Sequence, residues 1–342
     1  MNNMNDINDK RIRLAHGSGG KLSHDLVTGV MLPAFANAAL NELHDGARIN
    51  MPGVKLAFTT DSYVVKPLFF AGGNIGKLAV CGTVNDLAMC GADPHYLSAG
   101  FIIEEGFPVA DLIRIVESMQ AAASEAGVAI VTGDTKVVEK GAVDGIYINT
   151  AGIGAVIDGT GISPTRVRPG QDIILSGPVG NHAVAIMALR HGLVLPQTVT
   201  SDCAPLNGLV KELLSAVPDV AVLRDPTRGG LATTLNEIAQ QAAVGILVEE
   251  AAIPVQPEVA AACDILGFDP LYLANEGKMI IFSQPQASER LLAILKGHKY
   301  GKEAGIIGKV TDSPAGQVGL RTLIGGIRLL DMPVADQLPR IC

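Results

Sequence analysis

The sequence of 342 residues contains no tryptophan, and only 4% of its residues are aromatic. It also has no run of about 18 apolar residues, the length that a helix needs to cross a bilayer. Its polar start lacks the charged and apolar regions of a signal peptide. We therefore expect a soluble, cytoplasmic protein with no membrane partner.

Clusters of lysine and arginine are absent as well. The formal net charge is −8 and the isoelectric point is about 5.4. Binding to a phosphate backbone needs a concentrated basic surface. The charge balance therefore excludes a nucleic-acid-binding protein.

The five cysteines are odd in number and contain no C-x-x-C spacing, so neither a disulfide framework nor a thiolate zinc site is indicated. Four of them lie among apolar neighbours and are expected to fill the core: Cys81, Cys90, Cys203 and Cys263. The fifth, Cys342, is the last residue. A terminal thiol is either an accident of the chain end or a point of attachment, and composition leaves both readings open.

The residues that are abundant favour an α/β (α+β) protein. Apolar residues make up 48% of the chain and glycines number 39, which suits aliphatic cores joined by many tight turns. The length predicts two domains. A Gly- and Pro-rich linker at 158–170 separates an N-terminal domain, 13–162, from a C-terminal α/β domain, 163–330. We expect residues 1–12 to be disordered and 331–342 to form a flexible tail.

A glycine-rich segment near the start reads Gly17-Ser18-Gly19-Gly20-Lys21. Glycines let backbone N–H groups converge on an anion, and the lysine adds a positive charge. The spacing differs from that of a P-loop, so a flexible loop is an equal alternative.

Three acidic residues follow or interrupt apolar elements in the first domain. Asp61 follows a predicted strand at 54–60, Asp86 lies in a predicted helix at 75–90, and Asp134 follows a predicted strand at 128–131. Such carboxylates can hold Mg²⁺ together with phosphate oxygens, although each could simply cap a turn. Asn85, beside Asp86, is costly in an apolar helix unless it is paired or binds a ligand.

Two polar segments stand out in the second domain. Asp225 lies in a glycine-containing turn, 224–230, before a predicted helix at 231–243, which is a natural anion site or a capped turn. Glu276 lies just before a predicted strand at 279–282.

Seven motifs in order, covering the chain from about residue 12 to its end, resemble the HypE family of hydrogenase maturation factors, in the aminoimidazole ribonucleotide synthetase superfamily. They are HGSGGK at 16–21, TTDS at 59–62, GTVNDLAMCGADP at 82–94, TGDTKVV at 132–138, DPTRGGLA at 225–232, ANEGK at 274–278 and PRIC at 339–342.

The resemblance implies the two-domain fold of that superfamily. The N-terminal domain would carry a half-barrel sheet with helices, bind ATP and join a second copy in a homodimer. The C-terminal domain would form an α/β sandwich.

The resemblance also implies a reaction. A HypF-like carbamoyltransferase would load a carbamoyl group onto Cys342, and the enzyme would use ATP to dehydrate that group to a thiocyanate. The cyano group would pass to an iron-carrying HypC–HypD-like scaffold and become the cyanide ligand of [NiFe]-hydrogenase iron.

Residue roles follow from the matched motifs. Besides Cys342, Lys136 and Glu276 would orient and deprotonate the carried group, although either could form a simple ion pair. The residues expected to bind ATP are Gly19, Gly20, Lys21, Asn85, Asp86 and Asp134. The residues expected to bind Mg²⁺ are Asp61, Asp86, Asp134 and Asp225.

Two other readings share some of these features. A selenophosphate synthetase or a thiamine-monophosphate kinase would carry the glycine and aspartate motifs but would not need the terminal cysteine. A selenophosphate synthetase would also need a reactive Cys or selenocysteine near the glycine-rich segment, and 14–24 contain none. A non-catalytic assembly factor would use its tail as a docking peptide and would not hydrolyse ATP.

Overall fold

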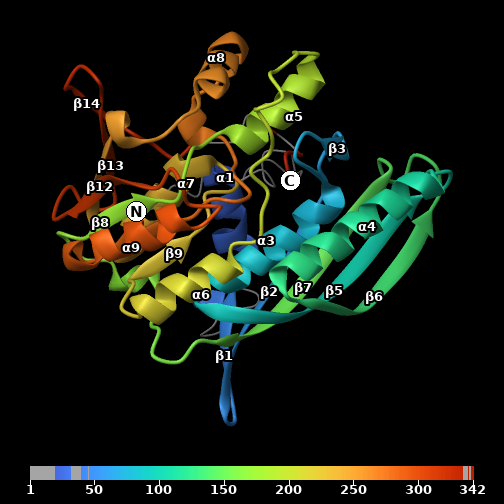
Figure 1. Ribbon diagram of the computed structural model, residues 1–342, viewed down its shortest axis with the longest axis horizontal. Helices are drawn as coiled ribbons and strands as arrows, with labels where there is room; N and C mark the ends of the chain where they lie inside the picture. Colours follow the sequence, from blue (N-terminus) through green and yellow to red (C-terminus); the bar gives the residue numbers. More distant parts are fainter. Residues whose placement is uncertain (1–19, 32–39, 45, 334–337, 339) are drawn as a thin grey trace.

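The computed structural model of the chain describes residues 20–31, 40–44, 46–333, 338 and 340–342 (Figure 1). The predicted extension at 1–12 and Gly19 lie outside these ranges. Within them, no helix has the length and apolar character required to cross a membrane.

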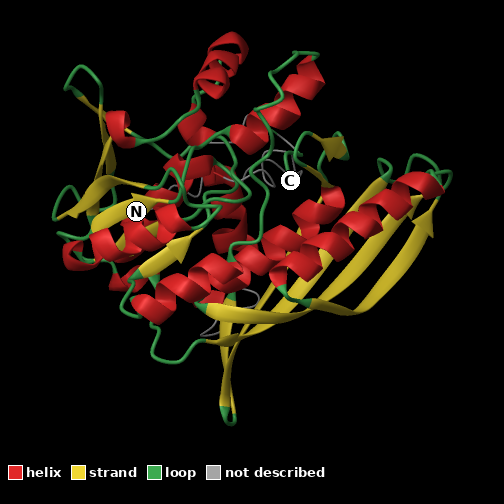
Figure 2. Ribbon diagram, viewed as in Figure 1, coloured by secondary structure: helices red, strands yellow, loops and turns green. Residues whose placement is uncertain are grey.

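The first half is built on a five-stranded sheet in the order β1-β2-β7-β5-β6. The pairs are antiparallel except β5 with β6, which are parallel and joined by the crossover helix α4. Figure 2 shows α3 and α4 lying across one face of this sheet. The elements are α1 (Gly20–Leu26), η2 (Val27–Met31), η3 (Leu40–Glu42), β1 (Ala47–Met51), β2 (Val54–Tyr63), β3 (Phe69–Phe70), β4 (Gly73–Asn74), α3 (Ile75–Met89), β5 (Ala92–Glu104), α4 (Val109–Ala126), β6 (Ala129–Val138) and β7 (Ile146–Val156).

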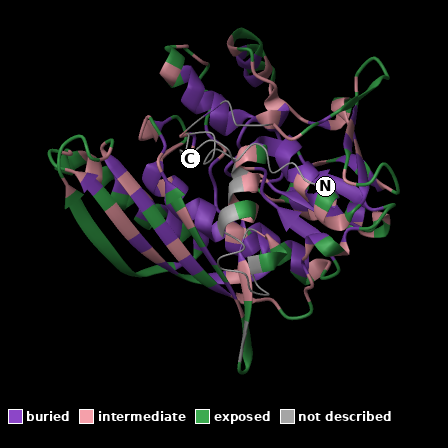
Figure 3. Cartoon of the chain, turned by 180° about the vertical axis from the view of Figure 1, so that it is seen from behind, coloured by how far each residue is buried: buried purple, intermediate pink, exposed green. Residues whose placement is uncertain are grey.

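Among the described residues, no helix packs across the other face of the five-stranded sheet. Side chains along a strand alternate between the two faces, and residues that pair across strands point to the same side. The alternation is visible as bands of buried and exposed residues in Figure 3. The large exposed side chains on this face include Phe58, Tyr96, Ile102 and Ile153. We call this surface the open sheet face.

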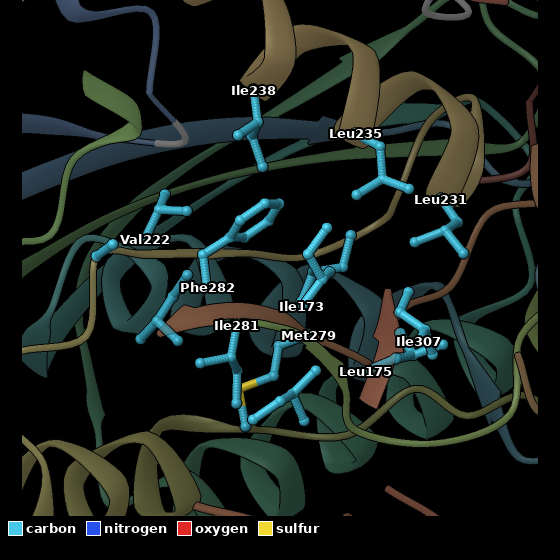
Figure 4. Close-up of a cluster of buried hydrophobic side chains, with 14 of the residues drawn as sticks. Ile173, Leu175, Val222, Leu231, Leu235, Ile238, Met279, Ile281, Phe282 and Ile307 are labelled. Carbon is cyan, nitrogen blue, oxygen red and sulfur yellow. The ribbon is translucent and has the colours of Figure 1, made fainter. Parts of the chain in front are cut away.

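The second half is built on a seven-stranded sheet in the order β14-β13-β10-β12-β8-β11-β9. Its core includes Leu231, Leu235 and Ile238 of α7, which point toward Ile173 and Phe282 of the sheet (Figure 4). The elements are η4 (Pro164–Arg166), β8 (Asp172–Leu175), α5 (Asn181–His191), α6 (Asn207–Ala216), β9 (Val222–Arg224), α7 (Gly230–Ala242), β10 (Gly245–Glu249), η5 (Glu250–Ala252), α8 (Pro257–Leu266), η6 (Pro270–Tyr272), β11 (Ile280–Ser283), α9 (Pro285–Gly297), β12 (Gly305–Thr311), β13 (Val318–Arg321) and β14 (Ile327–Leu329).

The two halves share apolar cores. Ala88 and Met89 of α3 belong to the core of the second half. The core beneath α3 and α4 in turn includes residues of α5 and α8, together with Leu338 and Ile341 of the tail. The architecture confirms the predicted α/β class. The predicted boundary at 162/163 falls between the end of β7 and the start of β8.

Candidate active site

A cavity of about 570 Å³ opens between the two halves. Its walls come from β2 and α3 on one side and from the start of α7 on the other, and Cys342 reaches it from the tail. Of the predicted site residues, the walls include Gly20, Asp61, Asp86, Asp225, Glu276 and Cys342.

Two carboxylates come from the first half. The hydroxyl of Thr59 donates to Oδ2 of Asp86 at 2.8 Å, which ties β2 to α3. Asp61 lies two residues further along β2, so its side chain points to the same face of the sheet as that of Thr59. Asp61 and Asp86 therefore lie in the same wall of the cavity.

Asp225 comes from the turn between β9 and α7. Gly229 and Gly230 in this turn have φ values of 73° and 63°, a region that favours glycine. A Cβ at Gly230 would also lie 2.7 Å from the carbonyl oxygens of Leu271 and Leu273. Desolvation raises the pKa of the buried Asp225 to about 6, against the opposing charge of Arg224.

Glu276 is buried in the wall of the cavity. Desolvation raises its pKa well above the usual range, and nearby negative groups add to the effect. Among the described residues, its Oε1 has no hydrogen-bond partner. Its backbone N–H donates to Oδ1 of Asp202 at 3.1 Å, which fixes the main chain. The free oxygen is therefore available to a group in the cavity.

The described residues at the end of the tail lie inside the molecule. Leu338 and Ile341 are buried, and Cys342 is half-buried at the cavity wall. Figure 1 places the C-terminus between the two halves, near α5 and β3. The four other cysteines are buried, as predicted. Among the described residues, Cys342 is thus the one thiol at the cavity.

Asp134 and Lys136 do not line this cavity. They lie within β6, which continues to Val138 instead of ending at 131, and they form an exposed ion pair at 2.9 Å. Lys136 pairs with Ile102 of β5, so both polar residues project from the open sheet face. Hydrogen bonding to Lys136 lowers the pKa of Asp134.

Asn85 is also away from the cavity wall. Its side-chain nitrogen donates to the carbonyls of Ala204 at 3.0 Å and Glu276 at 3.3 Å, and its oxygen accepts from the N–H of Leu206 at 2.8 Å. Its amide therefore joins the two halves. Lys21 is exposed at the start of α1, and its backbone N–H donates to the carbonyl of Pro333 at 2.9 Å.

The structure adds residues that the sequence did not single out. Arg228 lines the cavity, with Nη2 3.8 Å from Oδ1 of Asp61, and the negative charge at Cys342 is the largest effect that raises its pKa. Arg224 and Glu237 form an ion pair of 2.9 Å in another part of the wall. The DPTRGGLA motif contained the signal for Arg228, because this positive charge lies just before the N-terminus of α7, where an anion is favoured.

The chain matches two family models. Residues 43–156 match the AIR synthase related protein, N-terminal domain, and residues 168–321 match the corresponding C-terminal domain. The carbamoyl dehydratase HypE of Cupriavidus necator is 52% identical over 338 residues, which is 98% of this chain and 96% of that protein. The chain belongs to the HypE family.

Solved HypE structures have the same fold. A HypE–HypF complex contains a chain that is 49% identical with a TM-score of 0.86, and the match covers 90% of this chain and 99% of that one. HypE in complex with ATP is 50% identical with a TM-score of 0.83, and the match covers 97% and 100%. The predicted family and two-domain fold are confirmed, and membership among carbamoyl dehydratases favours an enzyme over a non-catalytic assembly factor.

Proposed function

We propose that this protein uses ATP to dehydrate a carbamoyl group carried on the sulfur of Cys342, giving a thiocyanate. The product would supply the cyanide ligand of [NiFe]-hydrogenase iron. One observation carries the proposal: Cys342 lines the same cavity as Asp61, Asp86, Asp225 and Glu276.

The chemistry explains why the cavity is acidic. An amide oxygen is a poor leaving group, so the γ-phosphoryl group of ATP is transferred to it and the oxygen then departs as phosphate. Two protons leave the nitrogen as the C≡N bond forms. One ATP and one S-carbamoyl group give ADP, phosphate and an S-cyano group. Phosphoryl transfer depends mainly on positioning and on neutralising charge.

The residues present fit a divalent cation with a nucleotide. Asp61 raises the pKa of Asp225, so two negative groups repel one another across the wall. Among the described residues, no three His, Cys, Asp or Glu side chains form a metal site by themselves. Mg²⁺ prefers a few carboxylates together with phosphate oxygens and water. Asp61, Asp86 and Asp225 would hold Mg²⁺, which supplies charge neutralisation for the phosphates when bound.

Glu276 would accept a proton from the carried group. A buried carboxylate with a raised pKa is a stronger base than a solvated one. Its Oε1 lacks a partner and lies at the cavity that Cys342 enters. Arg228 would place a positive charge opposite the developing phosphate, and Gly20 would bring backbone close to the nucleotide.

Asp134 and Lys136 would act from a second copy. Phe58 and Thr60 project from the open sheet face and also line the cavity. A second copy packed on this face would cover the exposed apolar side chains and lie beside the cavity. Asp134 and Lys136, on the same face, would then reach the partner copy's site. We infer a homodimer with shared sites on this basis.

Two further partners complete the proposed cycle. A HypF-like carbamoyltransferase would load Cys342, which is supported by the solved complex of a HypE relative with HypF. A HypC–HypD-like scaffold that carries iron would accept the cyano group. The described cysteines are all free thiols, which suits a reducing compartment such as the cytoplasm.

Intact-protein mass spectrometry tests the proposal. After incubation with carbamoyl phosphate, ATP and the carbamoyltransferase, the wild type should gain one carbamoyl group and then lose the mass of water. Glu276→Gln should accumulate the carbamoylated form, with dehydration slowed about 10²- to 10⁴-fold. Cys342→Ala should gain no adduct. An adduct that persists on Cys342→Ala would overturn the proposed attachment site.

A further inference from the structure

Two of the hydrogen bonds that hold the tail inside come from opposite ends of one helix, α5. We propose that His182 and Arg190 of this helix form a latch that fixes the fraction of time that Cys342 lies in the cavity. They are positioning residues, because they act through the tail backbone and not on the reacting atoms. The significance for catalysis rests on the proposed function, but the latch itself does not.

The tail runs beside the segment that follows β2. The N–H of Val64 donates to the carbonyl of Cys342 at 3.1 Å, and the N–H of Lys66 donates to the carbonyl of Arg340 at 3.3 Å. The pairing is antiparallel, like a short added strand. It fixes the direction of the tail, but two such bonds alone are a weak attachment.

His182 supplies a third bond from the interior. Its ring is fully buried, with Nδ1 2.8 Å from Oγ of Ser201 and Nε2 2.9 Å from the carbonyl oxygen of Ile341. A carbonyl can only accept, so Nε2 carries the hydrogen and Nδ1 accepts from the Ser201 hydroxyl. The N–H of Cys203 donates to that hydroxyl at 3.1 Å, which fixes its orientation. The arrangement holds His182 in the tautomer that binds the tail.

Arg190 supplies the fourth contact, from the other end of α5. Its Nε donates to the carbonyl of Lys66 at 2.6 Å, and its Nη2 donates to the carbonyl of Arg340. One guanidinium therefore bridges the tail and the segment beside it. The Arg340 side chain adds bonds to the carbonyl of Val64 at 2.8 Å and to Oδ2 of Asp144 at 2.7 Å.

The position of these donors separates the latch from the chemistry. His182 and Arg190 bind carbonyls of Ile341 and Arg340, so their bonds do not depend on what the sulfur of Cys342 carries. The same latch can hold the free thiol and the loaded tail. Loading by an external enzyme needs a detached tail, whereas dehydration needs an attached one. Weakening the latch should therefore accelerate the first step and slow the second.

Alkylation of Cys342 by iodoacetamide in the full-length protein measures detachment. The other four cysteines are buried in the folded protein, so the rate of alkylation by iodoacetamide reports on Cys342. His182→Leu removes the donor to Ile341 and should raise the alkylation rate about three- to tenfold, the change expected for one lost hydrogen bond. His182→Gln restores an N–H donor at the Nε2 position and should bring the rate back toward the wild type.

Two further variants serve as an independent test of the latch and as a matched control. Arg190→Met should raise the alkylation rate in the same direction, and it decides the question alone if His182→Leu does not fold. His191→Ala, at the exposed next position of α5, is the matched control and should react like the wild type. Wild-type alkylation rates in folded His182→Leu and Arg190→Met, or equal acceleration in His191→Ala, would overturn the latch.

The half-reactions give a second readout. In latch variants, carbamoylation by the transferase should be faster and dehydration slower, whereas a general loss of structure would slow both. Alkylation requires neither ATP nor a carbamoyl group. Faster alkylation in a protein that never dehydrates the adduct would keep the latch and reject the proposed function.

Discussion

The carboxyl groups of Asp225 and Glu276 are buried in the cavity wall, away from the water that would stabilise their negative charge. Burial raises the pKa of both. Such groups destabilise the folded protein at neutral pH, and they are commonly retained where chemistry needs them. Their number in one wall is a physical reason to expect that a bound cation stabilises this fold.

Asp225 gives a prediction at this scale. Its pKa rises from 3.8 to about 6 on folding, so the folded protein binds this proton more tightly and is favoured by it at low pH. The stabilisation is present below about pH 4 and is lost as the pH rises through about 6. The wild type should therefore lose stability between pH 4 and pH 7, and Asp225→Asn should lack this loss. The change in the free energy of unfolding from pH 4 to pH 7 should be more favourable in the variant by about 1–3 kcal/mol.

Urea denaturation of nucleotide-free protein at the two pH values measures the difference. The control is Asp312→Asn, at an exposed aspartate that does not line the cavity, and it should leave the pH dependence as it is. An identical pH dependence in Asp225→Asn and the wild type would contradict the raised pKa.

At the residue scale, the motifs selected several residues that meet at one cavity, but they did not show which groups each residue contacts. Asp61, Asp86, Asp225, Glu276 and Cys342 were selected by motif, and they line one cavity. Asn85 was correctly recognised as a polar group that needs partners, but its partners are backbone groups of the other half. Local sequence shows that a buried amide must be satisfied, and it does not show what satisfies it.

Elements were predictable where local signals are strong. The helix expected at 75–90 matches α3, which ends at Met89, two residues before Gly91 with its left-handed φ of 72°. The strand β6 was underestimated. Its second part, from Thr132 to Lys136, is polar and reads as a loop, but pairing with β5 carries it through Val138. Tertiary pairing outweighed local propensity there.

The α3–α4 contact gives a prediction at the element scale. A Cβ at Gly76 would lie 2.4 Å from the carbonyl oxygen of Ile115 in α4, so the two helices would have to separate. Gly76→Ala should lower the free energy of unfolding by about 1–3 kcal/mol in spite of its better helix propensity. Urea denaturation checks this.

The matched control is Gly208→Ala on α6, where a Cβ would meet nothing within 4 Å. It should be neutral or stabilising by up to about 1 kcal/mol. If Gly76→Ala behaved like this control, the close approach of α3 and α4 would be wrong.

At the scale of the whole molecule, the main feature is the open sheet face. It carries exposed Phe58, Tyr96, Ile102 and Ile153 beside Asp134 and Lys136. A sequence cannot reveal such a face directly, because it arises only when β6 extends and its register with β5 is set. In the proposed homodimer, this face would place Asp134 and Lys136 beside the cavity of the second copy.

A complementation experiment tests the shared site. Lys136→Met and Cys342→Ala should each be inactive alone, but heterodimers made by coexpression should regain dehydration, because one cavity then has both residues intact. The pair Glu276→Gln and Cys342→Ala should not complement, since both residues belong to the same cavity. Complementation by neither pair would place Lys136 outside the shared site.

The burial of Leu338 and Ile341 has a consequence for any protein that receives the tail. Taking two such side chains from the core into water costs about 3–6 kcal/mol, so an unassisted detached tail is a minor state. A receiving surface with two apolar pockets, one for each of these side chains, would bury them again and offset most of this free energy. The sulfur would then travel with a pair of hydrophobic anchors, and recognition between donor and acceptor proteins would depend on the anchors as well as on the thiol.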